Sequence, residues 1–160
     1  IGPVFNLRGL FFLRRYNTMY CKELTYDDYD GVTRTEKLWF HLSKPELLEL
    51  EYTTGKKFSE MLDDIVKAKN VSEIIKTFKT IILTAYGEKV DGRRFTKTDA
   101  EGHPLSRAFS ETAAYEVLYM LLSSDDEEAA KFINGIVPAD LREAAENAAS
   151  NADTAVLATA

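Results

Sequence analysis

The chain has 160 residues, of which 45% are hydrophobic and 29% charged, and its formal net charge is −6. This composition is typical of one globular domain, and a chain of this length can bury a core without metal or disulfide support. The single cysteine, Cys21, excludes an intramolecular disulfide and favours a reducing compartment. No run of about 18 apolar residues predicts a membrane span. The acidic balance argues against a nucleic-acid partner.

The first 18 residues differ in charge from the rest of the chain. They contain three of the 20 basic residues and none of the 26 acidic ones, so the net charge without them falls from −6 to −9. Their apolar core, residues 10–13, is too short for a secretory signal sequence. Arg14-Arg15 is what a translated ribosome-binding sequence would encode, a few codons before Met19. We therefore interpret residues 1–18 as a non-native translated leader, with a native N-terminal arm as the alternative. Residues 19–149 are predicted to form one domain and residues 150–160 a frayed tail.

Two stretches near the start of this domain have the period-two pattern of β-strands. In residues 19–26 and 32–42, apolar and aromatic side chains alternate with polar ones, which favours strands with one buried face. Asp30-Gly31, between the two stretches, is a strong signal for a hairpin turn. A calcium-binding loop is not indicated, because Tyr26 and Lys37 occupy its first and last ligand positions. We predict an antiparallel β-hairpin.

The strongest helical pattern lies at residues 71–86. Asn70 and Glu73 fit a capping box at its start, and Gly87 fits a left-handed terminator at its end. We predict that this helix is a central core element that the other elements cover. Its apolar residues recur at helical spacing and form one stripe, at Val71, Ile74, Ile75, Phe78, Ile81, Ile82 and Ala85.

Two further helices are predicted before the central one. Ser43 and Glu46 form a capping box, with Pro45 in the tolerated first turn, and Gly55 ends the helix. Residues 58–69 have an amphipathic spacing and form the next helix. The apolar side of the earlier helix comprises Leu47, Leu48, Leu50 and Tyr52.

The C-terminal half also has a mainly helical pattern. Pro104 opens a short helix, Ser110 is expected to cap a helix at residues 111–122, and Ser124 to cap an acidic helix that Asn134-Gly135 ends. A last helix is predicted at residues 138–148. The predicted fold class is α+β, with an N-terminal antiparallel β-hairpin followed by a mostly α-helical single domain of about five to six helices.

No catalytic, cofactor-binding or metal-binding residues are predicted. His41 and His103 lack the ligand spacing of a zinc site. Cys21 is expected to be a small buried side chain rather than a nucleophile. Residues 87–92 have the glycine spacing of a phosphate loop, but they follow a helix and lack the Lys and Ser/Thr that contact phosphate and magnesium. The sequence therefore predicts a protein that is not an enzyme.

Three stretches carry a family resemblance. They are MYCKELTYDDYDGVTRTEKLWFHLSKPEL at residues 19–47, IIKTFKTIILTAYGEKVDGRRFTKT at residues 74–98, and FINGIVP at residues 132–138. Together they resemble the siphophage tail assembly chaperones, small proteins encoded between the tail tube and tape measure genes of phages of Gram-positive hosts. The sequence departs from the family pattern at residues 100–104, where Gly102 and Pro104 interrupt an expected helix.

The resemblance implies a non-enzymatic protein of the host bacterial cytoplasm that binds the phage tape measure protein during tail assembly and is absent from the mature virion. It leaves open whether tail tube subunits are partners and whether the chain self-associates. Exposed aromatic residues such as Tyr29, Trp39 and Tyr119 on an acidic domain suit a helical client. Two alternatives are a small acidic phage-encoded inhibitor that mimics nucleic acid and a head–tail structural adaptor.

The polar segment at residues 88–104 is the candidate region for partner binding, because loops of this length in compact domains are usually functional or disordered. Asp91-Gly92 predicts a small hairpin anchored by Val90 and Phe95. The basic cluster there is diluted by acidic residues, which argues against a nucleic-acid patch. Internal pairing of the two arginines with Glu88 or Asp99 is the alternative to partner binding. The candidate partner-binding residues are Tyr86, Asp91, Gly92, Arg93, Arg94 and Phe95.

Overall fold

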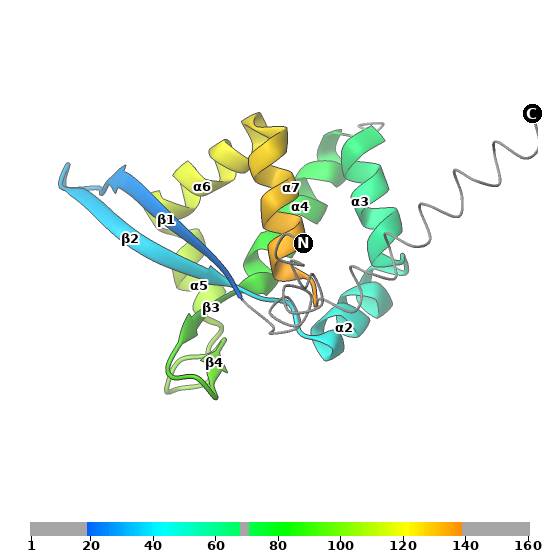
Figure 1. The fold of residues 1–160 in the computed structure, drawn as a ribbon, viewed down its shortest axis with the longest axis horizontal. Helices are drawn as coiled ribbons and strands as arrows, with labels where there is room; N and C mark the ends of the chain where they lie inside the picture. The colour runs from blue at the N-terminus through cyan, green and yellow to red at the C-terminus, as the bar shows by residue number, and fades with distance from the viewer. Residues whose placement is uncertain (1–18, 68–70, 139–160) are drawn as a thin grey trace, which may run out of the picture. The chain divides into compact units, whose positions relative to one another are not determined.

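The structure is a computed structural model that describes residues 19–67 and 71–138. Residues 19–136 form one compact unit, which is described here. Its fold is α+β, with a four-stranded antiparallel sheet and six helices among the described residues (Figure 1), so the predicted fold class is confirmed. The interpretations of residues 1–18, the cap at Asn70, the helix predicted at residues 138–148 and the tail at residues 150–160 lie outside the described residues.

The sheet is built from two consecutive hairpins. β1 (Tyr20–Asp27) and β2 (Thr33–Phe40) pair along their whole length, with Tyr20 opposite Phe40 at the base. β3 (Tyr86–Lys89) adds to the end of β2, and β4 (Phe95–Thr96) pairs with β3. Both predicted hairpins are confirmed. What the sequence pattern did not predict is that the second hairpin continues the sheet of the first, in the order β1-β2-β3-β4.

The helices fall into two groups by their contacts. One group contacts the sheet, because α6 and α7 pack on β1 and α5 packs on β3. The other group forms a chain of neighbours, in which α2 contacts α3, α3 contacts α4, and α4 reaches α5 (Figure 1). The bounds are α2 (Lys44–Thr54), α3 (Phe58–Lys67), α4 (Val71–Ala85), α5 (Leu105–Ser110), α6 (Ala113–Ser124) and α7 (Asp126–Ile136).

An aromatic cluster occupies the centre of the core. The Phe40 ring, at the end of β2, is fully buried. Four other rings lie within 6.3 Å of its centroid, from β1, β3, α5 and α7. Edge and tilted contacts of this kind stabilise beyond the area that they bury. The core thus joins strands β1, β2 and β3 to helices α5 and α7. The four rings are those of Tyr20, Tyr86, Phe109 and Phe132.

Helix α4 buries most of the apolar residues that the sequence pattern placed in its core stripe, but one of them is exposed to solvent. Phe78, Ile81, Ile82 and Ala85 are buried, as predicted. Ile75 is 49% exposed, so its assignment to the core stripe was wrong. Val71 and Ile74 belong to the residues whose side chains the structure does not describe.

Helix α2 has the predicted caps. The Ser43 hydroxyl accepts from the Glu46 amide, and the Glu46 carboxylate accepts from the Ser43 amide. Gly55 ends the helix with φ 68°, in the left-handed region that glycine tolerates. Two of its apolar residues, Leu48 and Tyr52, are 66% and 91% exposed. Their predicted inward position was therefore wrong, and only Leu47 and Leu50 reach the core.

Two predicted caps in the C-terminal half are displaced. Helix α6 is capped by Thr112, whose hydroxyl accepts from the Tyr115 amide, whereas the Ser110 hydroxyl donates to a carbonyl of α5. Helix α7 begins after Asp125, whose carboxylate accepts from two amides of the first turn. The predicted caps Ser110 and Ser124 were therefore wrong: the cap of α6 lies two residues later, at Thr112, and that of α7 one residue later, at Asp125. In both cases a second capping residue lies nearby in the sequence.

Two glycines that were predicted to end helices were also misread. Gly87 lies within β3, and Gly135 lies inside α7, which continues to Ile136. Neither has a positive φ. A Cβ atom at Gly87 would lie 2.7 Å from the Phe95 ring, and one at Gly135 would lie 2.6 Å from the Tyr20 ring. Both positions therefore require glycine for close approach of an aromatic ring, not for chain reversal.

Candidate partner-binding site

The predicted binding segment forms the hairpin between β3 and β4. The amides of Val90 and Asp91 donate to the Arg94 carbonyl at 3.1 and 3.4 Å. The Asp91 carboxylate accepts from the Arg93 amide at 2.7 Å, which fixes the turn from within. Val90, predicted as an anchor, is 57% exposed, so that part of the prediction was wrong.

The six predicted site residues divide into a base and a tip. Tyr86 and Phe95 belong to the base. The Tyr86 ring stacks on the Phe109 ring with centroids 3.9 Å apart, and burial raises the pKa of Tyr86. Phe95 is half-buried and packs edge-on against the imidazole of His41. These two aromatic residues hold the hairpin on the core.

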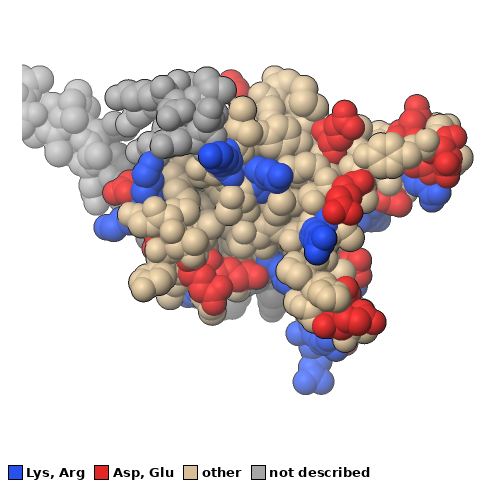
Figure 2. Space-filling view, turned by 180° about the vertical axis from the view of Figure 1, so that it is seen from behind, with Lys and Arg blue, Asp and Glu red and all other residues tan. Residues whose placement is uncertain are grey.

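The tip presents residues 91–94 to solvent. Arg93 and Arg94 are exposed, and neither forms an ion pair within the part of the chain that the structure describes. The alternative pairing of Arg93 and Arg94 with Glu88 or Asp99 is therefore not found. In Figure 2, which views the side opposite to Figure 1, basic side chains extend at the end of this hairpin. Two unpaired guanidinium groups on a braced turn can form bidentate contacts with carboxylates.

Lys97, three residues beyond Arg94, has a different environment that the sequence pattern did not reveal. Its ammonium group donates to the carbonyls of His41 at 2.7 Å and Thr84 at 2.5 Å. It also forms an ion pair with one Glu46 oxygen at 3.0 Å, while the other oxygen accepts from the Ser43 amide. This Lys97 junction joins the end of β2, the end of α4 and the start of α2. Carbonyls at the end of a helix lack intrahelical partners, so the Thr84 contact satisfies one of them.

The electrostatics of the Lys97 junction agree with a structural role. Burial lowers the pKa of Lys97, and the contact with Glu46 opposes that shift. Burial and the charge of Lys97 lower the pKa of His41. One signal could have found the junction in the sequence. Lys97 lies two residues after the anchor Phe95 and therefore shares its face of an extended strand.

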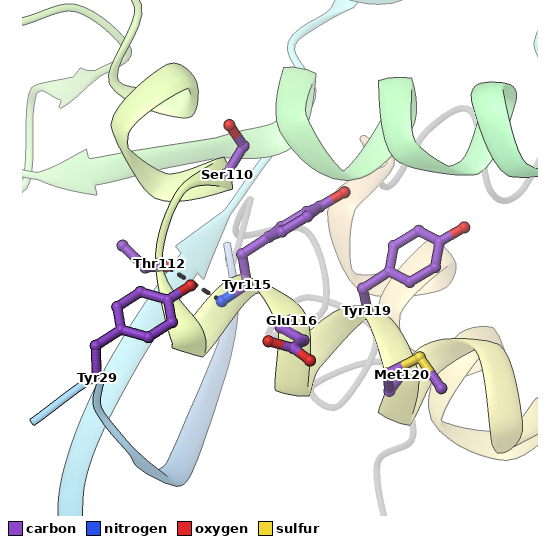
Figure 3. A pocket seen from close by; sticks show the side chains of 7 residues that line it. All are labelled: Tyr29, Ser110, Thr112, Tyr115, Glu116, Tyr119 and Met120. Atoms are coloured by element: carbon purple, nitrogen blue, oxygen red, sulfur yellow. Dashed lines mark hydrogen bonds between the residues drawn. The ribbon is translucent and has the colours of Figure 1, made fainter. Parts of the chain in front are cut away.

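Two of the three aromatic residues predicted to contact a client come together elsewhere. Tyr29, from the β1–β2 loop, and Tyr119, from α6, line an open depression of 360 Å³ (Figure 3). Tyr29 is 76% exposed. The third aromatic residue, Trp39, lies apart from this depression, with the Lys89 ammonium 5.0 Å from its ring centroid. The remaining lining residues are Ser110, Thr112, Tyr115, Glu116 and Met120.

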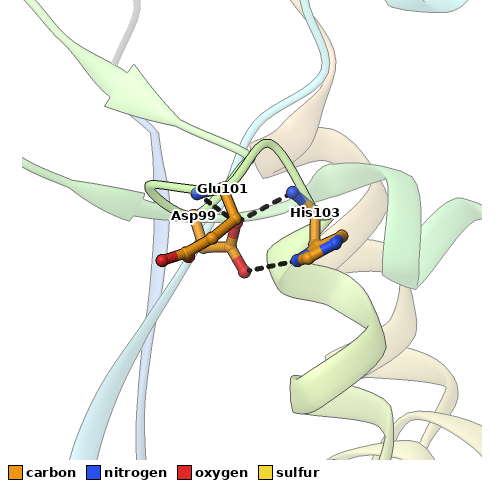
Figure 4. Close-up of side chains that lie close together, drawn as sticks. All are labelled: Asp99, Glu101 and His103. Carbon is orange, nitrogen blue, oxygen red and sulfur yellow. Dashed lines mark hydrogen bonds and ion pairs between the residues drawn. The ribbon is translucent and has the colours of Figure 1, made fainter.

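Three potential metal ligands lie close together in the loop after β4. The ligand atoms of Asp99, Glu101 and His103 lie within 4.8 Å of one another, and all three residues are exposed (Figure 4). Hydrogen bonds account for the arrangement. One Asp99 oxygen accepts from the amides of Glu101 and His103 at 3.0 and 2.8 Å, and the other lies 3.3 Å from the His103 imidazole. Gly102, with φ 86°, completes the turn, which delays α5 until Leu105.

The one cysteine is not where the sequence analysis placed it. Cys21 is exposed on β1, so the expectation of a buried side chain was wrong. Its neighbours Tyr20 and Lys22 face the helices, and the alternation of the strand turns Cys21 the other way. Among the described residues, no helix is long and apolar enough to span a bilayer.

The fold and these surfaces define a small α+β domain with an exposed arginine tip and an open depression lined by tyrosines. A family profile described as phage tail assembly chaperone matches residues 19–159. The chain therefore belongs to the phage tail assembly chaperone family, as its sequence resemblance predicted. No curated protein and no solved structure matches it.

Proposed function

We propose that this protein is a non-enzymatic chaperone that binds the phage tape measure protein in the host bacterial cytoplasm during tail assembly and is absent from the mature virion. The observation that carries the proposal is the match to the tail assembly chaperone family, which spans residues 19–159 and so includes every described residue. Tail tube subunits are a second candidate client.

The exposed tip of the β3–β4 hairpin supports a contact with an acidic site on the client. Arg93 and Arg94 make no internal ion pair in the described chain, so their charges contribute little to the fold. Arginine side chains of this kind recognise carboxylates with two parallel hydrogen bonds. The short hydrogen bond from the Arg93 amide to Asp91 limits the entropy that the tip loses on binding.

The proposal is tested by co-expression with the tape measure protein encoded in the same tail gene cluster. We expect the tape measure protein to stay soluble and to co-purify with this chain. We also expect mass spectrometry of purified virions to detect the tape measure protein but not this chain. A wild-type chain that captures no tail protein would overturn the chaperone role, whereas its presence in stoichiometric amounts in virions would favour a structural adaptor.

A further inference from the structure

The depression between the β1–β2 loop and α6 contains an exposed aromatic residue that the fold does not use. Tyr29 makes no hydrogen bond or ring contact with any described residue. Its loop is nevertheless well braced. The Asp28 carboxylate accepts from the amides of Asp30 and Val32 at 2.9 and 3.0 Å and pairs with Arg34. The braced loop therefore holds the Tyr29 ring beside α6, where this ring has no hydrogen-bond or ring partner among the described residues.

The remaining lining supplies more aromatic surface and one charge. Tyr115 and Tyr119, one helical turn apart on α6, have ring centroids 5.9 Å apart. Met120, which is 60% exposed, adds a polarisable apolar edge. Figure 3 places the Glu116 carboxylate between the Tyr29 ring and Met120. Three phenol rings, a thioether and a carboxylate thus surround one small open space.

The charge of this depression is negative and uncompensated. Glu116 is the only charged residue in its lining and forms no ion pair within the described chain. Two more exposed acids, Asp30 and Glu111, adjoin lining residues in the sequence. The basic residues nearest in sequence do not line it, and one of them, Arg34, is already paired with Asp28. An anionic ligand such as a nucleic-acid phosphate is therefore disfavoured.

We propose that this depression, lined by Tyr29, Tyr115, Glu116, Tyr119 and Met120, binds a lysine or arginine side chain presented by a protein partner. A cation over tyrosine faces is attracted by their quadrupoles, and the Glu116 carboxylate supplies the counter-charge. The apolar stem of the same side chain packs on Met120. The volume of 360 Å³ is at the small end for binding pockets, so it suits one anchoring side chain. The identity of the partner as the tape measure protein rests on the proposed function.

The proposal is tested with two peptides and the full chain. One is an alanine- and leucine-rich helical peptide with a single central arginine; the other has citrulline, a neutral isostere, in its place. In an NMR titration we expect the arginine peptide to shift amides at Tyr29 and in α6, and the citrulline peptide to bind about tenfold more weakly. Equal binding of the two peptides, or no shift at these positions, would overturn the proposal.

Two variants identify the residues responsible. Glu116→Gln is expected to weaken arginine-peptide binding by about five- to tenfold. Glu49→Gln, which removes an exposed charge on α2, outside the lining and its sequence neighbours, is expected to leave it unchanged. Tyr29→Ala should also weaken binding without lowering the melting temperature, because that side chain is 76% exposed and makes no hydrogen bond or ring contact with the described residues. Wild-type affinity in both Glu116→Gln and Tyr29→Ala would contradict a role for this depression.

Tape measure capture separates this inference from the proposed function. If the wild type captures the tape measure protein and both variants capture it equally well, the depression is not an anchor site and the inference fails alone. If the wild type binds the arginine peptide at this depression but no tail protein, the depression stands and the proposed function fails.

Discussion

Two basic regions of the same hairpin have opposite environments. Lys97 is enclosed by two carbonyls and a carboxylate from three other elements. Arg93 and Arg94, a few residues earlier, are exposed at the tip and have no ion pair in the described chain. In the sequence these residues form one basic cluster. In the structure, the lysine bridges three elements of the fold, whereas the two arginines are exposed and have no ion pair with a described residue.

The difference teaches that charge alone does not distinguish a binding residue from a structural one. A lysine becomes structural when carbonyls at element ends and a capping carboxylate converge on it, because each would otherwise lose hydrogen bonds on burial. Arginines at a hairpin tip meet no such groups. Substitution of Lys97 should therefore lower the free energy of unfolding, whereas substitution of Arg93 and Arg94 should lower the affinity for a partner and leave the stability unchanged.

The largest loss of stability is expected from Lys97→Met. This change removes the donor to His41 and Thr84 and leaves Glu46 without its counter-charge. We expect a loss of about 2–4 kcal/mol in the free energy of unfolding, measured by urea denaturation. Lys76→Met, on the exposed face of α4, is the control and should cost less than about 0.5 kcal/mol. Similar values for the two would mean that the Lys97 junction contributes nothing specific.

The next effect is expected at the base of the same hairpin. Gly87→Ala places a Cβ atom 2.7 Å from both the Phe95 ring and the Thr96 carbonyl oxygen, and the backbone oxygen cannot move aside cheaply. We expect a loss of about 1–3 kcal/mol in thermal or urea unfolding. Gly92→Ala, at the open tip with no atom within 4 Å, should be close to neutral. A neutral result for Gly87→Ala would show that β3 and β4 are less tightly paired.

The comparison also shows how far the sequence could predict this structure. Local signals were sufficient for the hairpin turn at Gly31, the capping box of Ser43 with Glu46, and the terminator Gly55, because each depends on neighbours in the chain. They failed at Gly87 and Gly135, whose role is set by a ring on another element. A glycine that ends a helix and a glycine that lies against an aromatic ring can both follow an apolar run, so the local sequence does not distinguish them.

Of the candidate functional surfaces, the sequence predicted the hairpin tip but not the Lys97 junction or the depression lined by tyrosines. The tip at residues 91–94 follows from a turn signal in a polar segment. The Lys97 junction requires a carbonyl from β2 and another from α4, and the tyrosine depression requires the β1–β2 loop to reach α6. Exposed aromatics could be named in the sequence, but only the packing of α6 on β1 brings Tyr29 and Tyr119 together.

A smaller effect is expected when the tip itself is changed. Arg93→Ala with Arg94→Ala removes no described internal ion pair, so the free energy of unfolding should change by less than about 0.5 kcal/mol. Thermal unfolding of the purified double variant measures this. A larger loss would show that the tip stabilises the fold and would remove the distinction between the two regions.

The pH dependence of stability sharpens the comparison further. Because burial lowers the pKa of Lys97 in the folded chain, the unfolded chain binds more protons between the two pKa values. The contribution of Lys97 to stability should therefore rise with pH as the ordinary lysine pKa is approached from below. Urea unfolding at two alkaline pH values measures this. The difference in free energy of unfolding between the wild type and Lys97→Met should be larger at the higher pH. A smaller difference there would contradict the burial of the Lys97 ammonium group.

The most direct test of a binding tip is the affinity of the tape measure protein for three forms of this chain. The wild type is compared with the Arg93→Ala, Arg94→Ala double variant and with a Lys76→Ala, Lys79→Ala double variant, which removes the same charge from the exposed face of α4. We predict that loss of the two arginines weakens binding at least about tenfold, the expected effect of losing charge-assisted hydrogen bonds. The lysine variant should bind like the wild type. Equal affinity for the wild type and the arginine variant, at unchanged melting temperature, would contradict the account of the tip.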